Sequence, residues 1–160
     1  MIGGNEEAFH AVKAVIQSFA KNLVHLGPVG SGHAVKAVNN TLLAANIFSV
    51  AEAMITLKSF DVPLEKALSA INTSSGRSWV SQQRFPDHVL SRTFDYGFSL
   101  SLHCKDVGTF EEMINEHNLE VSILRKILKT MQDAIMQLNP DADHLEVIKI
   151  IEGQSGITIQ

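Results

Sequence analysis

Apolar and polar positions follow a helical period near the start of the chain. From Asn5 to about Ala20, apolar residues recur every three or four positions, behind two acidic residues that suit the N-terminal end of a helix dipole. Asn5 is a good N-cap, so the pattern predicts an amphipathic helix. Short extended runs at 1–4 and 22–26 flank it. Because two short strands are marginal in water, we expect them to form the edge of a sheet completed outside this chain.

The longest uninterrupted helical pattern follows Gly32. No proline occurs before Pro63 and no glycine before Gly76. A helix of roughly 26 residues is about 40 Å long, which exceeds the width of a small domain. Its apolar residues are Val35, Val38, Leu42, Leu43, Ile47, Phe48, Val50, Met54, Ile55 and Leu57. They surround much of the helix axis, so we expect a central helix that is buried on several sides.

The rest of the chain predicts shorter helices. They cover about residues 63–72, 98–117, 121–138 and 143–152. Gly153 is expected to end the last of them, and Gly108 inside another implies a packing reason, since glycine costs about 1 kcal/mol against alanine there. Residues 77–95 mix aromatic and polar side chains and predict short helical turns plus loop. The expected fold class is mainly α, a helical bundle around one long helix, with a short strand–helix–strand unit at the N-terminus.

Composition limits the partners that this chain can have. Of its 160 residues, 45% are hydrophobic and 19% charged, and the net charge is −4. Scattered basic residues and a negative net charge argue against nucleic acid and against a membrane surface. The single cysteine, Cys104, cannot form an internal disulfide, and no targeting segment is evident, so we expect a cytoplasmic protein. The surplus of apolar residues predicts a missing partner surface and a homo-oligomer.

A glycine-rich turn leads into the long helix at Gly30, Ser31 and Gly32. Glycines let a ligand approach the backbone, and the unpaired N–H groups of a first helical turn attract anions, so a carboxylate suits this place. Lys36 lies about one turn further on, where the helix dipole disfavours a positive charge, which makes it a candidate acid and base. Asn40 shares its helix face and is placed to hold a substrate oxygen.

Less specific interpretations of these residues stay open. The glycines and Lys36 also fit an ordinary helix start with a solvated surface lysine. A dinucleotide loop is excluded, because the spacing G-x-x-G-x-G is the reverse of the nucleotide fingerprint. Lys105 and Asp106 are adjacent and point about 100° apart on a helix, which is more typical of a surface pair. No histidine pair has metal-ligand spacing and no serine lies in a G-x-S-x-G elbow, so neither metal nor serine chemistry is expected.

Several of these residues together resemble the signature of the β-hydroxyacid dehydrogenases, the family of 3-hydroxyisobutyrate dehydrogenase and tartronate semialdehyde reductase. They are Gly30-Ser31-Gly32, Lys36 and Asn39-Asn40 at the long helix, and Phe98 with Lys105-Asp106 further on. Residues 1–4 resemble the end of a late strand in that family's nucleotide-binding domain, and residues 75–79 are similar to some members. The resemblance covers essentially the whole chain, but the family's amino-terminal G-x-G-x-x-G fingerprint is absent from it.

The resemblance implies a division of the chain and a function. Residues 1–28 would be the remnant of an N-terminal Rossmann domain, and 29–160 a C-terminal helical substrate and dimerisation domain similar to that of 6-phosphogluconate dehydrogenase. The implied reaction is hydride transfer between a small hydroxy acid and NAD or NADP, which the missing domain would mainly bind. The implied roles are Lys36 as catalytic residue, Gly30, Ser31, Gly32 and Asn40 as substrate-binding residues, and Phe98, Lys105 and Asp106 as cofactor-binding residues. Alone, the chain is expected to be inactive.

A second hypothesis comes from a different class of protein. It is a non-enzymatic helical oligomerisation module that keeps the fold. It predicts that replacing Lys36 changes no activity, whereas polar substitutions at Val121, Leu128 and Ile135 abolish assembly. A decarboxylating dehydrogenase similar to 6-phosphogluconate dehydrogenase is disfavoured, because few basic residues lie near Lys36 to bind a phosphorylated sugar acid.

Overall fold

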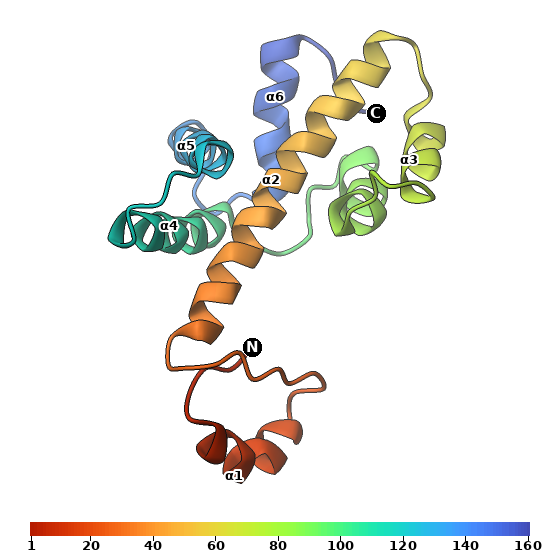
Figure 1. The fold of residues 1–160 in the computed structure, drawn as a ribbon. Coiled ribbons are helices and arrows are strands. Elements are labelled where there is room, and N and C mark those ends of the chain that lie inside the picture. Colours follow the sequence, from red (N-terminus) through yellow and green to blue (C-terminus); the bar gives the residue numbers. More distant parts are fainter.

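The computed structural model describes residues 1–160 and contains helices and connecting segments (Figure 1). The α-helices are α1 (Glu6–Gln17), α2 (Ser31–Ser59), α3 (Leu64–Asn72), α4 (Leu100–Glu116), α5 (Ser122–Gln137) and α6 (Val147–Ser155). A π-helix, η1 (Val80–Leu90), lies between α3 and α4, and a 3₁₀ turn, η2 (His144–Glu146), precedes α6. The prediction of a mainly α bundle around one long helix is confirmed.

The 29 residues of α2 form the axis of the bundle. At 1.5 Å per residue the helix is about 44 Å long, and Figure 1 shows it crossing the molecule, with α1 apart at one end. Helices α3, η1, α4, α5 and α6 all pack on it. Ala44 and Ala51 let neighbouring helices approach closely, and Ile47 and Met54 are buried between them. This coverage explains an apolar composition that, by length and hydropathy alone, would also suit a membrane-crossing helix.

The N-terminal unit contains its predicted helix but not its predicted strands. Ile2 and His25 form a single parallel bridge, and Ile2 makes two backbone hydrogen bonds to the facing segment, of 2.9 and 2.8 Å. The pairing ends at Gly4 and Gly27, whose φ angles of +151° and +109° turn the chain away before a ladder can form. The prediction of two strands is therefore wrong for this chain. The assignment of residues 1–28 to a separate domain stays a prediction.

Residues 77–95 are more regular than predicted. They contain the eleven-residue π-helix η1 in place of short turns and loop. Pro86 inside it cannot donate a backbone hydrogen bond, which makes the segment resemble a loop in the sequence. Ser81 Oγ donates to Asn72 Oδ1 (2.7 Å), and Asn72 Nδ2 donates to Ser81 O (3.0 Å), which ties η1 to α3. Phe85 is fully buried, so tertiary packing holds a helix that the local sequence does not favour.

Helices α4 and α5 pack against each other and against α2. The apolar seam predicted over 121–138 lies inside the chain, because Leu128, Met131 and Ala134 are each at most 2% exposed. It is therefore core and not a free dimer surface. Gly108 in α4 has no neighbour within 4 Å of the place where a Cβ would lie, so this chain does not supply the packing reason expected for it.

The C-terminal helix ends later than predicted. Helix α6 continues through Gly153 and ends at Ser155, and the φ of +68° at Gly156 gives a left-handed C-cap. Beyond it, Ile159 is fully buried, and its N–H donates to Glu152 Oε1 (2.7 Å). Arg92 forms an ion pair with the same carboxylate and also donates to Ile159 O (3.0 Å). These contacts fasten the last residues to the bundle.

Candidate active site

Lys36 and Asn40 lie one turn apart on α2 and bind the same carboxylate on α4. Lys36 Nζ donates to Asp106 Oδ2 (2.5 Å), and Asn40 Nδ2 donates to the same oxygen (2.7 Å). The i, i+4 spacing places both donors on one helix face, as the sequence predicts. The Lys36 side chain is 54% exposed and that of Asp106 only 12%. The carboxylate is therefore an anchor within the fold, while the amine stays accessible to a ligand.

The electrostatics of Asp106 favour its ionised form. Partial burial raises the pKa of this carboxyl, but the hydrogen bonds from Lys36 and Asn40 and the positive charges of Lys36 and Lys105 outweigh it, so that the pKa lies below its ordinary value. At neutral pH the carboxylate is thus charged and holds both donors. The result is a fixed pair of polar groups on α2, one charged and one neutral, which face the same oxygen.

Close backbone packing shapes the glycine turn beside this network. Gly30 begins α2 with φ +95° and no side chain caps the first turn. A Cβ on Gly32 would lie 3.0 Å from Met1 O, and one on Gly3 would lie 2.5 Å from Pro28 O. Gly3 and Gly32 are therefore needed for the first residues of the chain to pack on the start of α2. A role of the turn in substrate binding stays a prediction.

A cleft of about 570 Å³ opens beside the glycine turn. Lys36 lines it together with Gly30 and Gly32 and with residues 1–3. Ser31 belongs to the same turn but does not line the cleft. The structure thus brings the predicted catalytic lysine and two of the predicted substrate-binding glycines to one opening, which an acid of a few carbon atoms could enter.

The three residues predicted to bind the cofactor do not form one cluster. Asp106 forms an ion pair with Lys36. Lys105 is exposed, and it affects Asp106 only through its charge. Phe98 is half-buried before the start of α4, where its ring packs on His103 with 5.2 Å between the ring centroids. Their roles toward a cofactor stay predictions.

Two buried histidines behind the network were missed by the sequence analysis. His103 Nε2 donates to Asn40 O (2.9 Å), because a carbonyl oxygen can only accept. His103 Nδ1 is then free to accept from His144 Nδ1, 3.0 Å away. Burial lowers the pKa of both, that of His144 to about 2, so both are neutral at physiological pH. The sequence position of His103 could have indicated its place behind the network, because it precedes Asp106 by three residues and shares its helix face.

Comparison with known proteins identifies the domain. A family model described as NAD-binding of NADP-dependent 3-hydroxyisobutyrate dehydrogenase matches residues 30–151, most of the chain. The chain belongs to the 3-hydroxyisobutyrate dehydrogenase family. It corresponds to the C-terminal helical domain of that family, and the resemblance found in the sequence is confirmed.

Individual relatives agree with this assignment. The chain is 30% identical over 159 residues to 2-(hydroxymethyl)glutarate dehydrogenase from Eubacterium barkeri, which is 99% of this chain and 53% of that protein. It is 32% identical over 142 residues to the mitochondrial 3-hydroxyisobutyrate dehydrogenase of Drosophila melanogaster, 83% of this chain and 44% of that protein. The structure of Mycobacterium tuberculosis 3-hydroxyisobutyrate dehydrogenase with L-serine shares the fold, with a TM-score of 0.88 at 22% identity over 94% of this chain and 54% of that one. The chain spans about half the length of these relatives.

Acid is expected to destabilise this 3-hydroxyisobutyrate dehydrogenase-family domain through its buried histidines. In the folded state the pKa values of His103 and His144 lie below the ordinary 6.5. The unfolded chain therefore binds protons first, and the free energy of unfolding falls as the pH drops below about 6.5. Each histidine contributes up to about 1.4 kcal/mol per pH unit. Urea unfolding between about pH 7 and pH 5 measures the slope.

A variant separates this effect from general acid instability. His144→Asn keeps an N–H donor for His103 Nδ1 but removes one titrating group, so the slope should fall by about half. The exchange His117→Asn, at an exposed position, is the matched control and should leave the slope unchanged. An identical pH dependence in wild type and His144→Asn contradicts the assignment.

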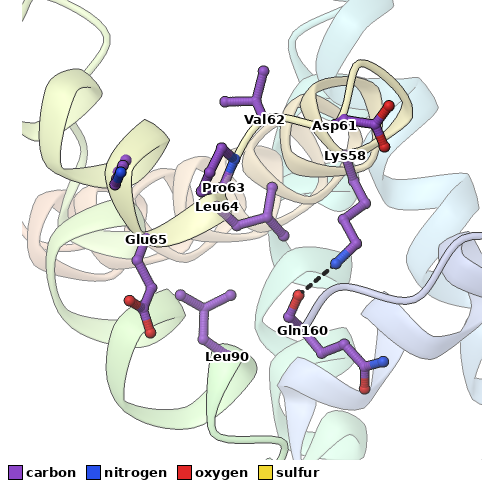
Figure 2. Close-up of a pocket in the computed structure, with 9 residues that line it drawn as sticks. Lys58, Asp61, Val62, Pro63, Leu64, Glu65, Leu90 and Gln160 are labelled. Atoms are coloured by element: carbon purple, nitrogen blue, oxygen red, sulfur yellow. Dashed lines mark hydrogen bonds between the residues drawn. The ribbon is translucent and has the colours of Figure 1, made fainter.

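A second cavity, of about 410 Å³, lies at the far end of α2 (Figure 2). Lys58 Nζ donates to Gln160 O (2.8 Å) across it, and Figure 2 shows Leu64 and Leu90 beside this contact. Lys58 follows Lys36 by 22 residues on the same helix, which separates the two by about 33 Å. This cavity is therefore no part of the candidate active site of the family domain.

Proposed function

We propose that this chain is the substrate-side domain of an NAD(P)-dependent β-hydroxyacid dehydrogenase, in which Lys36 is the general acid and base. The observation that carries the proposal is the bonding of Lys36 and Asn40 to one half-buried carboxylate, with Lys36 also lining a cleft. Membership of the 3-hydroxyisobutyrate dehydrogenase family supports it. Because the chain spans about half the length of its relatives, the proposed enzyme also contains a nucleotide-binding domain as partner.

Lys36 moves the proton in this proposal. In reduction its ammonium donates a proton to the substrate carbonyl oxygen, and in oxidation its neutral amine accepts the hydroxyl proton. An ammonium has three N–H donors and Asp106 occupies one, so two remain for the substrate. The amide of Asn40 likewise keeps one N–H after bonding to Asp106, and this donor orients the same substrate. Asp106 holds both groups in position.

The residues beside this network fit a nicotinamide cofactor. Lys105 presents an exposed ammonium next to Asp106, which suits a cofactor oxygen, and the partly exposed ring of Phe98 suits an apolar contact. When bound, a nicotinamide supplies or accepts the hydride at the substrate carbon. The choice between NAD and NADP belongs to the nucleotide-binding partner domain in this proposal.

The printed names of the relatives support the substrate class. One is a 2-(hydroxymethyl)glutarate dehydrogenase and another a 3-hydroxyisobutyrate dehydrogenase, and both named substrates are acids with a hydroxyl on the β carbon. We therefore assign a small β-hydroxy acid to this chain. Its α-carboxylate suits the start of α2, where uncapped N–H groups and the helix dipole favour an anion.

Exposed apolar side chains on α1 and just after its end support a neighbouring domain. Val12, Val15 and Phe19 are 46%, 67% and 76% exposed, and α1 lies apart from the bundle (Figure 1). An apolar helix face of this kind is stabilised when another domain covers it. We assign residues 1–28 to the nucleotide-binding partner domain on this basis.

The proposed function is tested on the two-domain enzyme. A panel of small β-hydroxy acids is incubated with NAD⁺ or NADP⁺, and formation of reduced nicotinamide is followed by absorbance. We expect reduction with at least one acid, and none with the 160-residue chain alone. The absence of turnover with every acid and both nucleotides would rule the function out and favour a binding module.

A further inference from the structure

A buried histidine binds the backbone of Asn40, a residue that the proposed function places at the substrate. His103 projects from α4 and is fully buried, and its Nε2 group donates to the carbonyl oxygen of Asn40 (2.9 Å). A carbonyl oxygen has two lone pairs, so it accepts this bond in addition to its helical one. His103 lies three residues before Asp106 on the same face of α4. Helix α4 therefore holds Asn40 at two points, its backbone and its amide group.

A second buried histidine fixes which nitrogen of His103 carries the proton. His144 Nδ1 lies 3.0 Å from His103 Nδ1. Because burial lowers the pKa of both rings, each carries one proton at neutral pH. His103 carries its proton on Nε2, since an unprotonated Nε2 would place two acceptors 2.9 Å apart. The hydrogen bond between the two rings is then donated by His144.

Backbone hydrogen bonds hold His144 against His103. The N–H of His144 donates to Phe98 O (2.8 Å), and Leu100 N donates to Ala142 O (2.8 Å). These bonds join the turn before η2 to the start of α4. The ring of Phe98 packs on both histidines, with centroid separations of 5.2 Å to His103 and 5.1 Å to His144. Both rings are fully buried, so the pair is shielded from water and has one orientation.

We propose that His103 is a positioning residue, which holds the amide of Asn40 in the orientation that the substrate needs. The inference rests on the proposed function, in which this amide orients the substrate oxygen. The direction of its free N–H depends on where the Asn40 backbone lies relative to Asp106, and the bond from His103 fixes that place. Without this donor, small shifts of α2 against α4 would change the angle at which the amide meets the substrate.

The contact is tested first by NMR spectroscopy of the 160-residue chain. His103 should show the tautomer with its proton on Nε2, and His144 the tautomer with its proton on Nδ1. The side-chain amide resonance of Asn40 should move in His103→Met, which has no donor. It should stay near its wild-type position in His103→Gln, which has a similar shape and keeps an N–H donor.

The role of His103 is tested by steady-state kinetics of the two-domain enzyme. In His103→Met we expect the KM for the hydroxy acid to rise about 3- to 10-fold, the usual net effect of one neutral hydrogen bond. The KM for the nicotinamide should not change, and His103→Gln should restore the KM for the acid. A merely structural defect lowers the amount of active enzyme, and therefore the maximal rate, but changes neither KM.

Ser81→Ala is the matched control, because it removes a buried hydrogen bond, to Asn72, that involves neither α2 nor α4. It should change neither KM nor the Asn40 resonance. The proposal is overturned by a proton on His103 Nδ1 in the neutral wild type, by an Asn40 resonance that stays in place in His103→Met, or by an acid KM that is equal in His103→Met and His103→Gln. Failure of the proposed function is distinct, since it appears as absence of turnover in the wild-type two-domain enzyme while the Asn40 resonance still reports the contact.

Discussion

Replacing Lys36 by alanine is expected to lower turnover of the two-domain enzyme by about 10²- to 10⁴-fold, the usual contribution of a positioned acid or base. The substrate oxygen would then have no group on α2 that gives or takes a proton. Affinity for the nicotinamide should change little, because this residue contacts Asp106 and the cleft. Steady-state rates in both directions, with cofactor titration, measure the two effects separately.

Lys36→Arg separates proton transfer from charge. A guanidinium keeps the positive charge beside Asp106 but does not give up a proton at accessible pH, so oxidation should stay as slow as in the alanine variant. Lys129→Ala, an exposed change on α5, is the control and should leave turnover intact. Near wild-type rates in Lys36→Ala or Lys36→Arg would remove this residue from the mechanism.

Replacing Asp106 by asparagine is expected to lower turnover by about 10- to 100-fold through loss of positioning. The carboxylate oxygen holds both Lys36 and Asn40, and an amide of the same shape cannot hold the ammonium by charge. Steady-state rates of oxidation and reduction measure this loss.

Glu112→Gln is the matched control for this change, because it also neutralises a carboxylate on α4 but at an exposed position. It should leave turnover unchanged. Asp106→Asn with a normal rate would show that the carboxylate does not position Lys36.

Local signals were sufficient for most of the helices. Asn5 caps α1 through its side chain, which accepts from Ala8 N (3.1 Å), as its residue type predicts. The absence of glycine and proline after Gly32 predicts α2, and the spacing of apolar residues predicts α5. The same i, i+4 reasoning placed Lys36 and Asn40 on one face. In each case the residues that determine the feature lie within a few positions of it in the sequence.

Distant contacts decided the remaining features. Pro86 and its polar neighbours predict short helical turns plus loop, but burial of Phe85 holds η1 as one continuous helix. The extended runs at 1–4 and 22–26 have strand-like sequences, yet with no further strand to pair with they form only one bridge. The residues of one segment indicate whether it can be extended, but the number of strands that pair with it depends on the whole fold.

By itself, the sequence determined the helical class, the long central helix, the family resemblance and the placement of Lys36 with Asn40, because each depends on residue type and short-range spacing. Tertiary structure alone decided that Asp106 binds both of them, that His103 and His144 form a neutral buried pair, and that Arg84 Nε and Nη1 are buried without hydrogen-bond partners. These features join elements up to 70 residues apart. Their energies depend on burial and on donor–acceptor distance, which exist only after the helices have packed.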